Sequence, residues 1–316
     1  MFNPLVSIVI PMYNSREWIV KLLFTISEQT YKNIEIVIVN DGSSDSSELD
    51  VSHFMDTHPQ LKIRIINQEN KGVSNARNNG VHHSNGELIA FVDSDDIWHS
   101  TKIEDQVRKL QVESAQAVAC SYVIFKDSNF EAVQIVNPDW TQRGVINWLL
   151  LRTYGGLLSS TLMLTKTAFE EVGPFDVELS LSADIEFAIR LIKIYPITLI
   201  EIPLVGYRLR ENQMHHQESL LLSESKRMLK KVDLLRVPEN QRIFLANLNL
   251  RLALYRLTKI DIFKAHKFFI LAIKSSPKET LQTLARILLN RFKRKTNKTL
   301  ENQSFLTQSS QSQSKQ

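Results

Sequence analysis

Short apolar stretches that end in polar residues alternate with amphipathic stretches along the first third of the chain. Val6–Ile10, Ile34–Asn40, Lys62–Ile66 and Leu88–Val92 are typical of buried strands. The stretches between them carry the spacing of amphipathic helices, in which one face is apolar. This alternation predicts an α/β domain with a mostly parallel, Rossmann-like sheet that is covered by helices on both faces.

Local signals place the predicted helices. Asn14 is expected to be the N-cap of the helix after the first strand, with Glu17 completing a capping box. Ser44 or Asp45 is expected to cap the next helix. Gly72–Val81 is predicted to be a loop that leads into a third helix.

The polar ends of the predicted strands are far apart in the sequence. Pro11-Met12-Tyr13, Asp41 and Asp93–Asp96 each follow one of these strands directly. Parallel sheets of this class bind ligands beyond the carboxyl ends of their strands. We therefore expect these residues to meet at one ligand-binding edge.

The rest of the chain predicts a second, helical region. Residues 1–216 are expected to form the α/β domain, and 217–298 a basic helical region with helices over Ile243–Tyr255, Ile260–Lys274 and Lys278–Phe292. Residues 299–316 are rich in Ser and Gln and are expected to be a disordered tail.

Cysteine usage and hydropathy indicate the compartment. Cys120 is the only cysteine, which excludes an intrachain disulfide framework and fits a reducing environment. No stretch reaches the roughly 18 apolar residues of a spanning helix. A cytoplasmic protein is expected, with peripheral membrane contact as the alternative to a purely cytosolic location.

The acidic cluster Asp93-Ser94-Asp95-Asp96 places carboxylates at alternate positions where a strand ends. Hard oxygen ligands of this kind suit Mg²⁺ or Mn²⁺ that bridges phosphate oxygens. The structural alternative is an acidic turn that caps the next helix. Asp41 at a second strand end favours the metal and nucleotide interpretation.

Three more residues are candidates for nucleotide contacts. Asp41 can accept a hydrogen bond from a nucleobase, or be a simple turn residue before Gly42. Tyr13 offers a flat face for a base, or is a core aromatic. Arg77 lies one turn into the helix after Gly72, where it can reach a diphosphate with a fork of donors, or lie on a solvated face.

These motifs together resemble the inverting family 2 glycosyltransferases of the GT-A fold, over roughly residues 5–210. The resemblance rests on the order and spacing of four segments: Ser7-Ile8-Val9-Ile10-Pro11-Met12-Tyr13-Asn14, Val39-Asn40-Asp41-Gly42-Ser43-Ser44-Asp45, Gly72-Val73-Ser74-Asn75-Ala76-Arg77-Asn78 and Phe91-Val92-Asp93-Ser94-Asp95-Asp96.

The resemblance implies a role for each matched residue. Pro11, Tyr13 and Asp41 are expected to line the nucleoside, and Arg77 to hold the diphosphate. Asp93 is expected to contact ribose or metal, and Asp95 to ligate the metal. The remaining nucleotide-sugar-binding residues expected from these motifs are Asn14 and Ser94.

The family's remaining signature is an acidic pair followed by an aromatic residue and an arginine. Here it reads Ser182-Ala183-Asp184-Ile185-Glu186-Phe187-Ala188-Ile189-Arg190, so Asp184 falls at the position of the catalytic base. Ala183 replaces the usual glutamate before it. Arg208, in the segment that resembles the family's closing strand, is expected near phosphate or metal.

The resemblance implies a metal-dependent enzyme that transfers a sugar from a nucleotide-sugar donor, of the UDP or dTDP type, to an acceptor hydroxyl with inversion. Synthesis of polysaccharide, glycolipid or cell-envelope glycan is expected, with a glycan or lipid-linked acceptor and no nucleic-acid partner. The alternatives are an inactive glycosyltransferase-like binding module, which Ala183 favours, and a nucleotidyltransferase, whose glycine-rich phosphate loop is missing after the first strand.

The C-terminal segment Arg286–Lys298 has six basic residues and no acidic one, interleaved with apolar residues. A basic amphipathic helix can lie on an anionic membrane surface. The structural alternatives are a solvated end of a packing helix, or helix packing that serves oligomerisation.

Overall fold

The computed structural model describes residues 3–126, 132–141, 143–144, 147, 158–209, 218–258 and 260–296. These residues fall into two compact units, one with residues up to 141 and from 158 to 209, and one with the helices between 218 and 296. The expected disordered tail, 299–316, lies outside the described residues. The domain boundaries expected from the sequence stay predictions.

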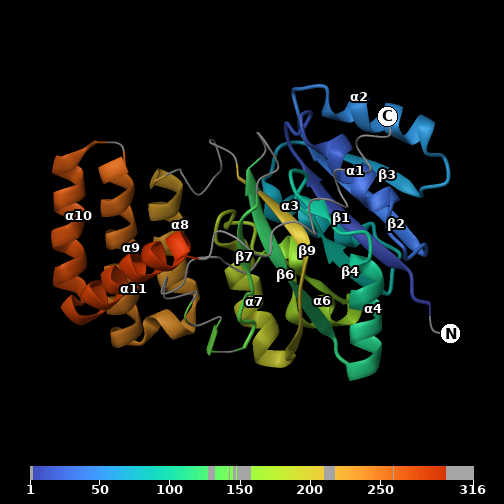
Figure 1. Ribbon diagram of the computed structural model, residues 1–316. Helices are drawn as coiled ribbons and strands as arrows, with labels where there is room; N and C mark the ends of the chain where they lie inside the picture. The colour runs from blue at the N-terminus through green and yellow to red at the C-terminus, as the bar shows by residue number, and fades with distance from the viewer. Residues whose placement is uncertain are drawn as a thin grey trace. The chain divides into compact units, whose positions relative to one another are not determined.

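The described strands of the first unit form one nine-stranded sheet in the order β3-β2-β1-β4-β8-β6-β9-β5, with β7 paired to β6 (Figure 1). Its strands are β1 (Val6–Met12), β2 (Ile34–Asp41), β3 (Ile63–Gln68), β4 (Leu88–Phe91), β5 (Ile97–Trp98), β6 (Ala117–Lys126), β7 (Ala132–Val136), β8 (Met163–Thr165) and β9 (Ile197–Leu209). The expected α/β class is confirmed.

The first four strands of the chain, β1 to β4, are parallel to one another, as the alternation predicts. β1 pairs with β2 and β4, and β2 pairs with β3, all in parallel register. Met12 lies beside Asn40, and Asp41 beside Gln68, so the three strands end at one level. Beyond β4 the sheet is mixed, because β8 runs antiparallel to both β4 and β6 while β9 runs parallel to β6.

Six helices and one 3-10 turn accompany these strands among the described residues. They are α1 (Ile19–Ser27), α2 (Ser47–Thr57), α3 (Val73–His82), α4 (Lys102–Glu113), η1 (Ser159–Thr161), α6 (Lys166–Val172) and α7 (Ala183–Ile194). The expected N-cap at Asn14 is wrong, because α1 begins five residues later with Trp18 at its N-cap position. Asn14 instead has a left-handed backbone with φ 47°.

Alternating side chains of the central strands divide the core into two layers. Ile8 and Ile10 of β1 belong to the hydrophobic cluster that includes the buried faces of α1, α2 and α4. On the opposite face, Val9 packs beneath Gly80 of α3. Phe91 of β4 packs on that face against aromatic side chains of the α6–α7 region. Both faces of the sheet are therefore covered.

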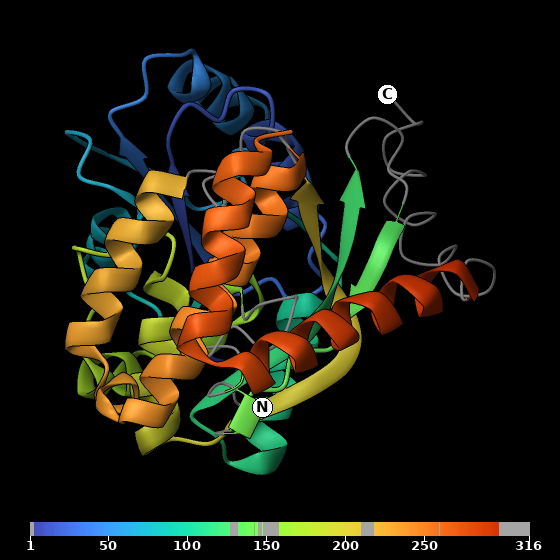
Figure 2. The same cartoon turned by 90° about the vertical axis from the view of Figure 1, so that its left-hand side faces the viewer.

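The second unit is helical, as its composition predicts. It contains α8 (Glu218–Lys231), η3 (Asp233–Arg236), α9 (Pro238–Thr258), α10 (Ile262–Ser275) and α11 (Pro277–Thr296). α9 and α10 lie side by side, and α11 packs against both (Figures 1 and 2). Within the described part of the chain, no helix combines the length and the apolar character that crossing a bilayer demands.

Close packing at Gly80 generates a testable prediction. A Cβ at this position would lie 2.4 Å from Val9 Cγ1 and 3.4 Å from Val39 Cγ2. Alanine favours helices over glycine by about 1 kcal/mol, but forcing a methyl group into a packed core costs about 1–3 kcal/mol. We expect Gly80→Ala to lower the denaturation midpoint of the first unit.

The control is the same substitution in a Val9→Ala background, which removes the clashing methyl group. There Gly80→Ala should be neutral or stabilising. Equal losses of stability in both backgrounds, measured by denaturant unfolding, would show that contact with Val9 is not the reason for glycine at position 80.

Candidate functional site

Arg77 lies at the centre of a group of charged residues from three separate parts of the first unit. Its Nη2 donates to Asp93 Oδ1 at 2.7 Å, and its Nη1 donates to Asp184 Oδ1 at 2.8 Å. The arginine is supplied by α3, Asp93 follows β4, and Asp184 lies in the first turn of α7. One guanidinium thus joins two carboxylates that are 91 residues apart in the sequence.

Burial determines what Arg77 can contact. Its side chain is 3% exposed, against 34% for Asp93 and 20% for Asp184. Burial acts to lower the pKa of Arg77, but the carboxylates of Asp184 and Asp93 raise it above its usual range, so the guanidinium stays charged. Each Nη atom donates to one of the two carboxylates, and the buried Nε has no hydrogen-bond partner among the described residues.

The surroundings of Asp184 shift its pKa in both directions, with a net rise. Burial raises its pKa, and the nearby charge of Asp93 raises it further, whereas Arg77 and a hydrogen bond from Ser159 N to Asp184 Oδ2 at 3.0 Å lower it. A base whose pKa lies above that of an ordinary aspartate is better matched to taking a proton from a hydroxyl. The N-cap of α7 is Ser182, so Asp184 does not serve as the cap.

Two residues outside the acidic cluster, Ser160 and Arg208, hold it through hydrogen bonds. Ser160 Oγ donates to Asp96 Oδ2 at 2.6 Å and accepts from Asp93 N at 3.0 Å. Arg208 Nε donates to the carbonyl of Asp95 at 2.8 Å. Together they fix the backbone turn that follows β4.

Arg208 therefore lies elsewhere than the sequence suggests. It is fully buried, and its guanidinium lies 4.7 Å from the ring centres of both Trp18 and Phe125. A side chain enclosed by aromatic rings and hydrogen-bonded to the main chain supports the acidic turn and does not face a phosphate. The neighbouring Arg210 lies outside the described residues.

The three acidic side chains of the cluster are close enough to influence one another. Burial raises the pKa of Asp96 well above its usual value, and the charges of Asp95 and Asp93 raise it further. Ser94, between them, shares a 2.6 Å hydrogen bond with Ser15 after β1. The exposed edge of this cluster is Asp93, because Ser94, Asp95 and Asp96 are buried.

The donor set fits a divalent metal that also binds a substrate. Asp93 and Asp95 provide hard carboxylate oxygens, as Mg²⁺ and Mn²⁺ prefer. No group of three or more His, Cys, Asp or Glu forms a complete metal site within the described ranges. One or two carboxylates are sufficient where phosphate oxygens and water complete the coordination shell.

Asp41 ties the end of β2 to the start of α3. Its Oδ1 accepts from Gln68 Nε2 and from Lys71 N, both at 2.8 Å, and its Oδ2 accepts from Gly72 N at 2.9 Å. The anion that the N-terminus of α3 favours is thus a carboxylate of this chain. Asp41 is buried, and one acceptor position on Oδ2 is left for a ligand.

The loops after β1 and β2 are joined by Asn14. Its side-chain Oδ1 accepts from Ser44 N at 2.8 Å, and its backbone N donates to Ser43 Oγ at 3.0 Å. Pro11 is buried within β1, whereas Tyr13 is 51% exposed. Tyr13 therefore presents its ring to solvent at the edge where the strands end.

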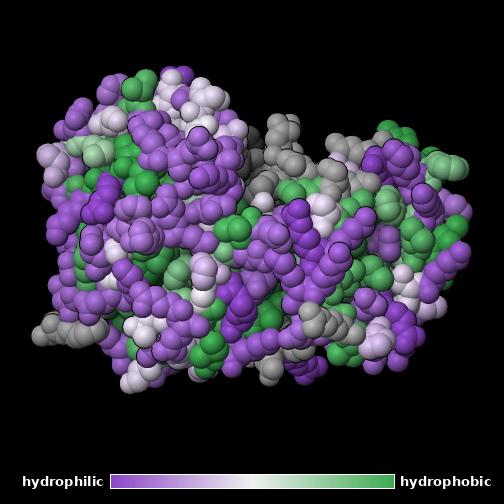
Figure 3. Space-filling view, turned by 180° about the vertical axis from the view of Figure 1, so that it is seen from behind, coloured by the Kyte–Doolittle hydropathy of each residue, from purple (hydrophilic) through white to green (hydrophobic). Residues whose placement is uncertain are grey.

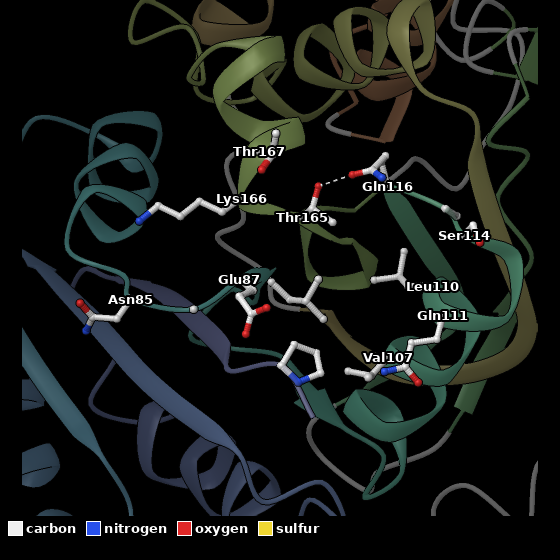
Figure 4. A pocket seen from close by; sticks show the side chains of 14 residues that line it. Asn85, Glu87, Val107, Leu110, Gln111, Ser114, Gln116, Thr165, Lys166 and Thr167 are labelled. Atoms are coloured by element: carbon white, nitrogen blue, oxygen red, sulfur yellow. Dashed lines mark hydrogen bonds between the residues drawn. The ribbon is translucent and has the colours of Figure 1, made fainter. Parts of the chain in front are cut away.

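The structure thus gathers the expected residues along one edge. Arg77, Asp93 and Asp184 are in direct contact, while Asn14 joins the first two loops and Asp41 joins the second loop to α3. Ser159 and Ser160 were missed because a pair of serines before a short strand carries no spacing signal. A cavity of about 770 Å³ lies elsewhere, lined by residues such as Glu87, Leu110 and Lys166 and by none of the expected site residues (Figure 4).

The three hydrogen bonds of Asp41 generate a prediction. Asp41→Asn places an NH₂ group against backbone N–H donors, and hydrogen bonds to a charged acceptor contribute about 1.5–3 kcal/mol each. We expect the amides of Lys71 and Gly72 to exchange with solvent deuterium at least tenfold faster. Asp50→Asn, which alters only a long ion pair with Arg16 at 3.4 Å, is the control. Unchanged exchange at both amides in Asp41→Asn would contradict this role.

Comparison with solved structures supports the fold. At 17% identity and a TM-score of 0.56, the chain resembles S. aureus TarS 1-349 solved with UDP-GlcNAc, over 84% of this chain and 90% of that one. It resembles mannosyltransferase PcManGT from Pyrobaculum calidifontis, solved with GDP-Man and Mn²⁺, at 17% identity and a TM-score of 0.56, over 89% of this chain and 88% of that one.

Sequence relatives extend the comparison. The amylovoran biosynthesis glycosyltransferase AmsB of Erwinia amylovora is 30% identical over 226 residues, which cover 69% of this chain and 74% of AmsB. An uncharacterised glycosyltransferase of Rickettsia felis is 28% identical over 257 residues, but the match spans 78% of this chain and only 42% of that protein. The family model for glycosyl transferase family 2 matches residues 7–167, from the start of β1 into α6. On this match and the likeness to AmsB, the chain belongs to glycosyl transferase family 2.

Proposed function

We propose that this protein transfers a sugar from a UDP- or dTDP-type nucleotide-sugar donor to an acceptor hydroxyl, with inversion at the anomeric carbon. The observation that carries the proposal is the pair of ion pairs through which Arg77 holds Asp93 of the acidic cluster beside Asp184. Sugar transfer needs a group that binds the donor diphosphate and a base that activates the acceptor within one small site. The contacts of Arg77 bring the residues proposed for these two roles, Asp93 and Asp184, together.

The donor would lie along the edge where β1, β2 and β4 end. Tyr13 would stack on the base, and Asp41 and Pro11 would line the nucleoside, with Asn14 holding the loops in place. Ser94 and Asp93 would face the ribose and diphosphate. Asp95 and Asp93 would hold Mn²⁺ or Mg²⁺, which when bound neutralises charge on the departing diphosphate.

The reaction would be a single in-line displacement. Asp184 takes the proton from the acceptor hydroxyl while the hydroxyl oxygen attacks the anomeric carbon. The bond to the nucleoside diphosphate breaks on the opposite side, so the configuration inverts. Arg77 holds Asp184 in place, and its positive charge keeps the base ionised.

The acceptor class is proposed from the relatives. AmsB is named for amylovoran biosynthesis, and solved structures of this fold contain UDP-GlcNAc or GDP-Man with Mn²⁺. These observations favour assembly of a polysaccharide, glycolipid or cell-envelope glycan on a glycan or lipid-linked acceptor. A cytoplasmic location fits a nucleotide-sugar donor, and self-association through the helical unit is compatible with this proposal.

Membrane contact through Arg286–Lys298 belongs to the same proposal. Part of this segment, up to Thr296, forms the end of α11, while Lys298 lies outside the described residues. Arg286 donates from Nη2 at 2.8 Å to the buried Glu279, and its side chain remains 38% exposed.

The role of Asp184 has a direct test. We expect Asp184→Asn to reduce sugar transfer about 10²- to 10⁴-fold, as loss of a general base does, while donor nucleotide binding changes little. Calorimetric binding of UDP with Mn²⁺ and a transfer assay separate the two effects. Glu186→Gln, two residues along α7, is the control and should keep transfer near wild type. Wild-type transfer by Asp184→Asn would contradict the assignment.

The charge of Arg77 generates a pH prediction. Because Arg77 lowers the pKa of Asp184, Arg77→Lys, which cannot hold both carboxylates, should let that pKa rise. Asp184 must be ionised to act as a base. As the pH is lowered, the variant should therefore lose activity at a higher pH than wild type does. We expect the acid limb of the kcat/KM profile to move up by about one pH unit. Arg190→Lys should leave the limb unmoved, and an equal shift in both variants would contradict the prediction.

A further inference from the structure

The turn that joins α9 to α10 exposes four apolar side chains in a span of seven residues. Leu257 is 52% exposed, Ile260 83%, Ile262 67% and Phe263 85%. We call these four residues the apolar tip. Single exposed apolar residues are normal on protein surfaces, but a cluster of them marks an interaction site.

The backbone of Ile260, within the tip, is strained, and the packing of the core does not require this strain. Ile260 has φ 59°, in the left-handed region that β-branched residues almost never adopt. Glycine or asparagine would satisfy this turn without strain. Because the Ile260 side chain is exposed, it also contributes little to the core. An apolar side chain kept at a strained, exposed position indicates a role outside the fold.

Hydrogen bonds join residues of the turn to the helices on either side. Ile260 N donates to the carbonyl of Leu257 at 3.1 Å, and Asp261 N donates to that of Arg256 at 3.0 Å. Asp261 also caps α10, accepting from Lys264 N at 3.1 Å. The exposed apolar side chains therefore lie on a segment that is hydrogen-bonded to α9 and α10.

The net charge of the helical unit, and two exposed lysines beside the tip, indicate the partner. Residues 218–296 contain 18 Lys and Arg against 6 Asp and Glu, a net charge of +12, whereas residues 1–217 contain 18 against 27, a net charge of −9. Asp261, an acidic residue in the same turn, has its Oδ2 3.4 Å from Arg256 Nη1 and 3.5 Å from Lys264 Nζ. Lys264 and Lys267 are exposed beside it.

We propose that the apolar tip docks onto an anionic lipid bilayer. Phe263 and Ile260 enter the boundary between headgroups and acyl chains, and Lys264 and Lys267 face lipid phosphates. Figure 3 shows hydrophobic side chains interspersed with hydrophilic ones over the C-terminal helices. A turn with four apolar side chains is small for a stable protein interface, which buries about 1,200–2,000 Å² in total, whereas insertion into a bilayer needs no shape complementarity.

This surface is separate from the Arg286–Lys298 segment and does not depend on the transfer reaction. The tip joins α9 to α10, whereas that segment ends α11. Binding to lipid can therefore be measured without donor, and a failure of either proposal leaves the other testable.

The test uses the full chain in flotation with two kinds of vesicle, pure phosphatidylcholine and phosphatidylcholine containing phosphatidylglycerol. The tip variant is Ile260→Asn with Phe263→Ser. Asparagine accepts the left-handed backbone, so thermal unfolding should show no loss of stability. The control is Leu281→Ser, which removes an apolar side chain of α11 that is 67% exposed.

We expect wild type and Leu281→Ser to bind the anionic vesicles, and the tip variant to bind at least tenfold more weakly. Each of the three proteins should bind pure phosphatidylcholine vesicles at least tenfold more weakly than wild type binds the anionic vesicles. The proposal is overturned if wild type does not bind anionic vesicles, or if the tip variant binds as wild type does. It is also overturned if wild type forms dimers in sedimentation that the tip variant abolishes, since a second copy then covers the tip.

Discussion

A buried arginine with two carboxylate partners is the interaction on which the site depends. Removing a charge from water costs several kcal/mol unless hydrogen bonds and opposite charges compensate for it. Arg77 meets this requirement because its Nη2 donates a hydrogen bond to Asp93 and its Nη1 donates one to Asp184. Its position in α3 therefore fixes where the end of β4 and the start of α7 must lie.

The packing around Arg77 makes this arrangement rigid. Phe175 lies 5.3 Å from the guanidinium and stacks on Phe187 of α7 at 4.4 Å between ring centres. Gly80 lets α3 sit directly on Val9 of β1. The acidic cluster and Asp184, the proposed base, thus belong to one packed body.

The sequence predicts the strands that end at the site because their signals are local. Apolar runs that stop at Pro11, Asp41 and Asp93 define β1, β2 and β4 to within a residue or two. Strand β5 carries no such signal, because its two residues form a strand only by pairing with β9. β7, likewise absent from the predicted strands, forms by pairing with β6.

Side-chain partners were harder to predict than strands. The spacing that suggests a helix cap at Asn14 is present in the sequence. In the folded chain the side chain of Asn14 instead accepts hydrogen bonds from the backbone N–H groups of Ser44 and Asp45, in the loop after β2. Arg77 was expected to face a diphosphate, and only the folded chain shows two carboxylates around it. Contacts between residues far apart in sequence leave no periodic trace.

The most direct test of this account is a crystal structure of the protein with UDP and Mn²⁺. The account predicts the uracil near Tyr13 and Asp41, the metal on Asp95 and Asp93, and Arg77 still bound to both Asp93 and Asp184. A nucleotide bound away from the ends of β1, β2 and β4 would contradict the proposed donor site. An Arg77 turned away from Asp184 to bind the diphosphate would contradict its role in holding the base.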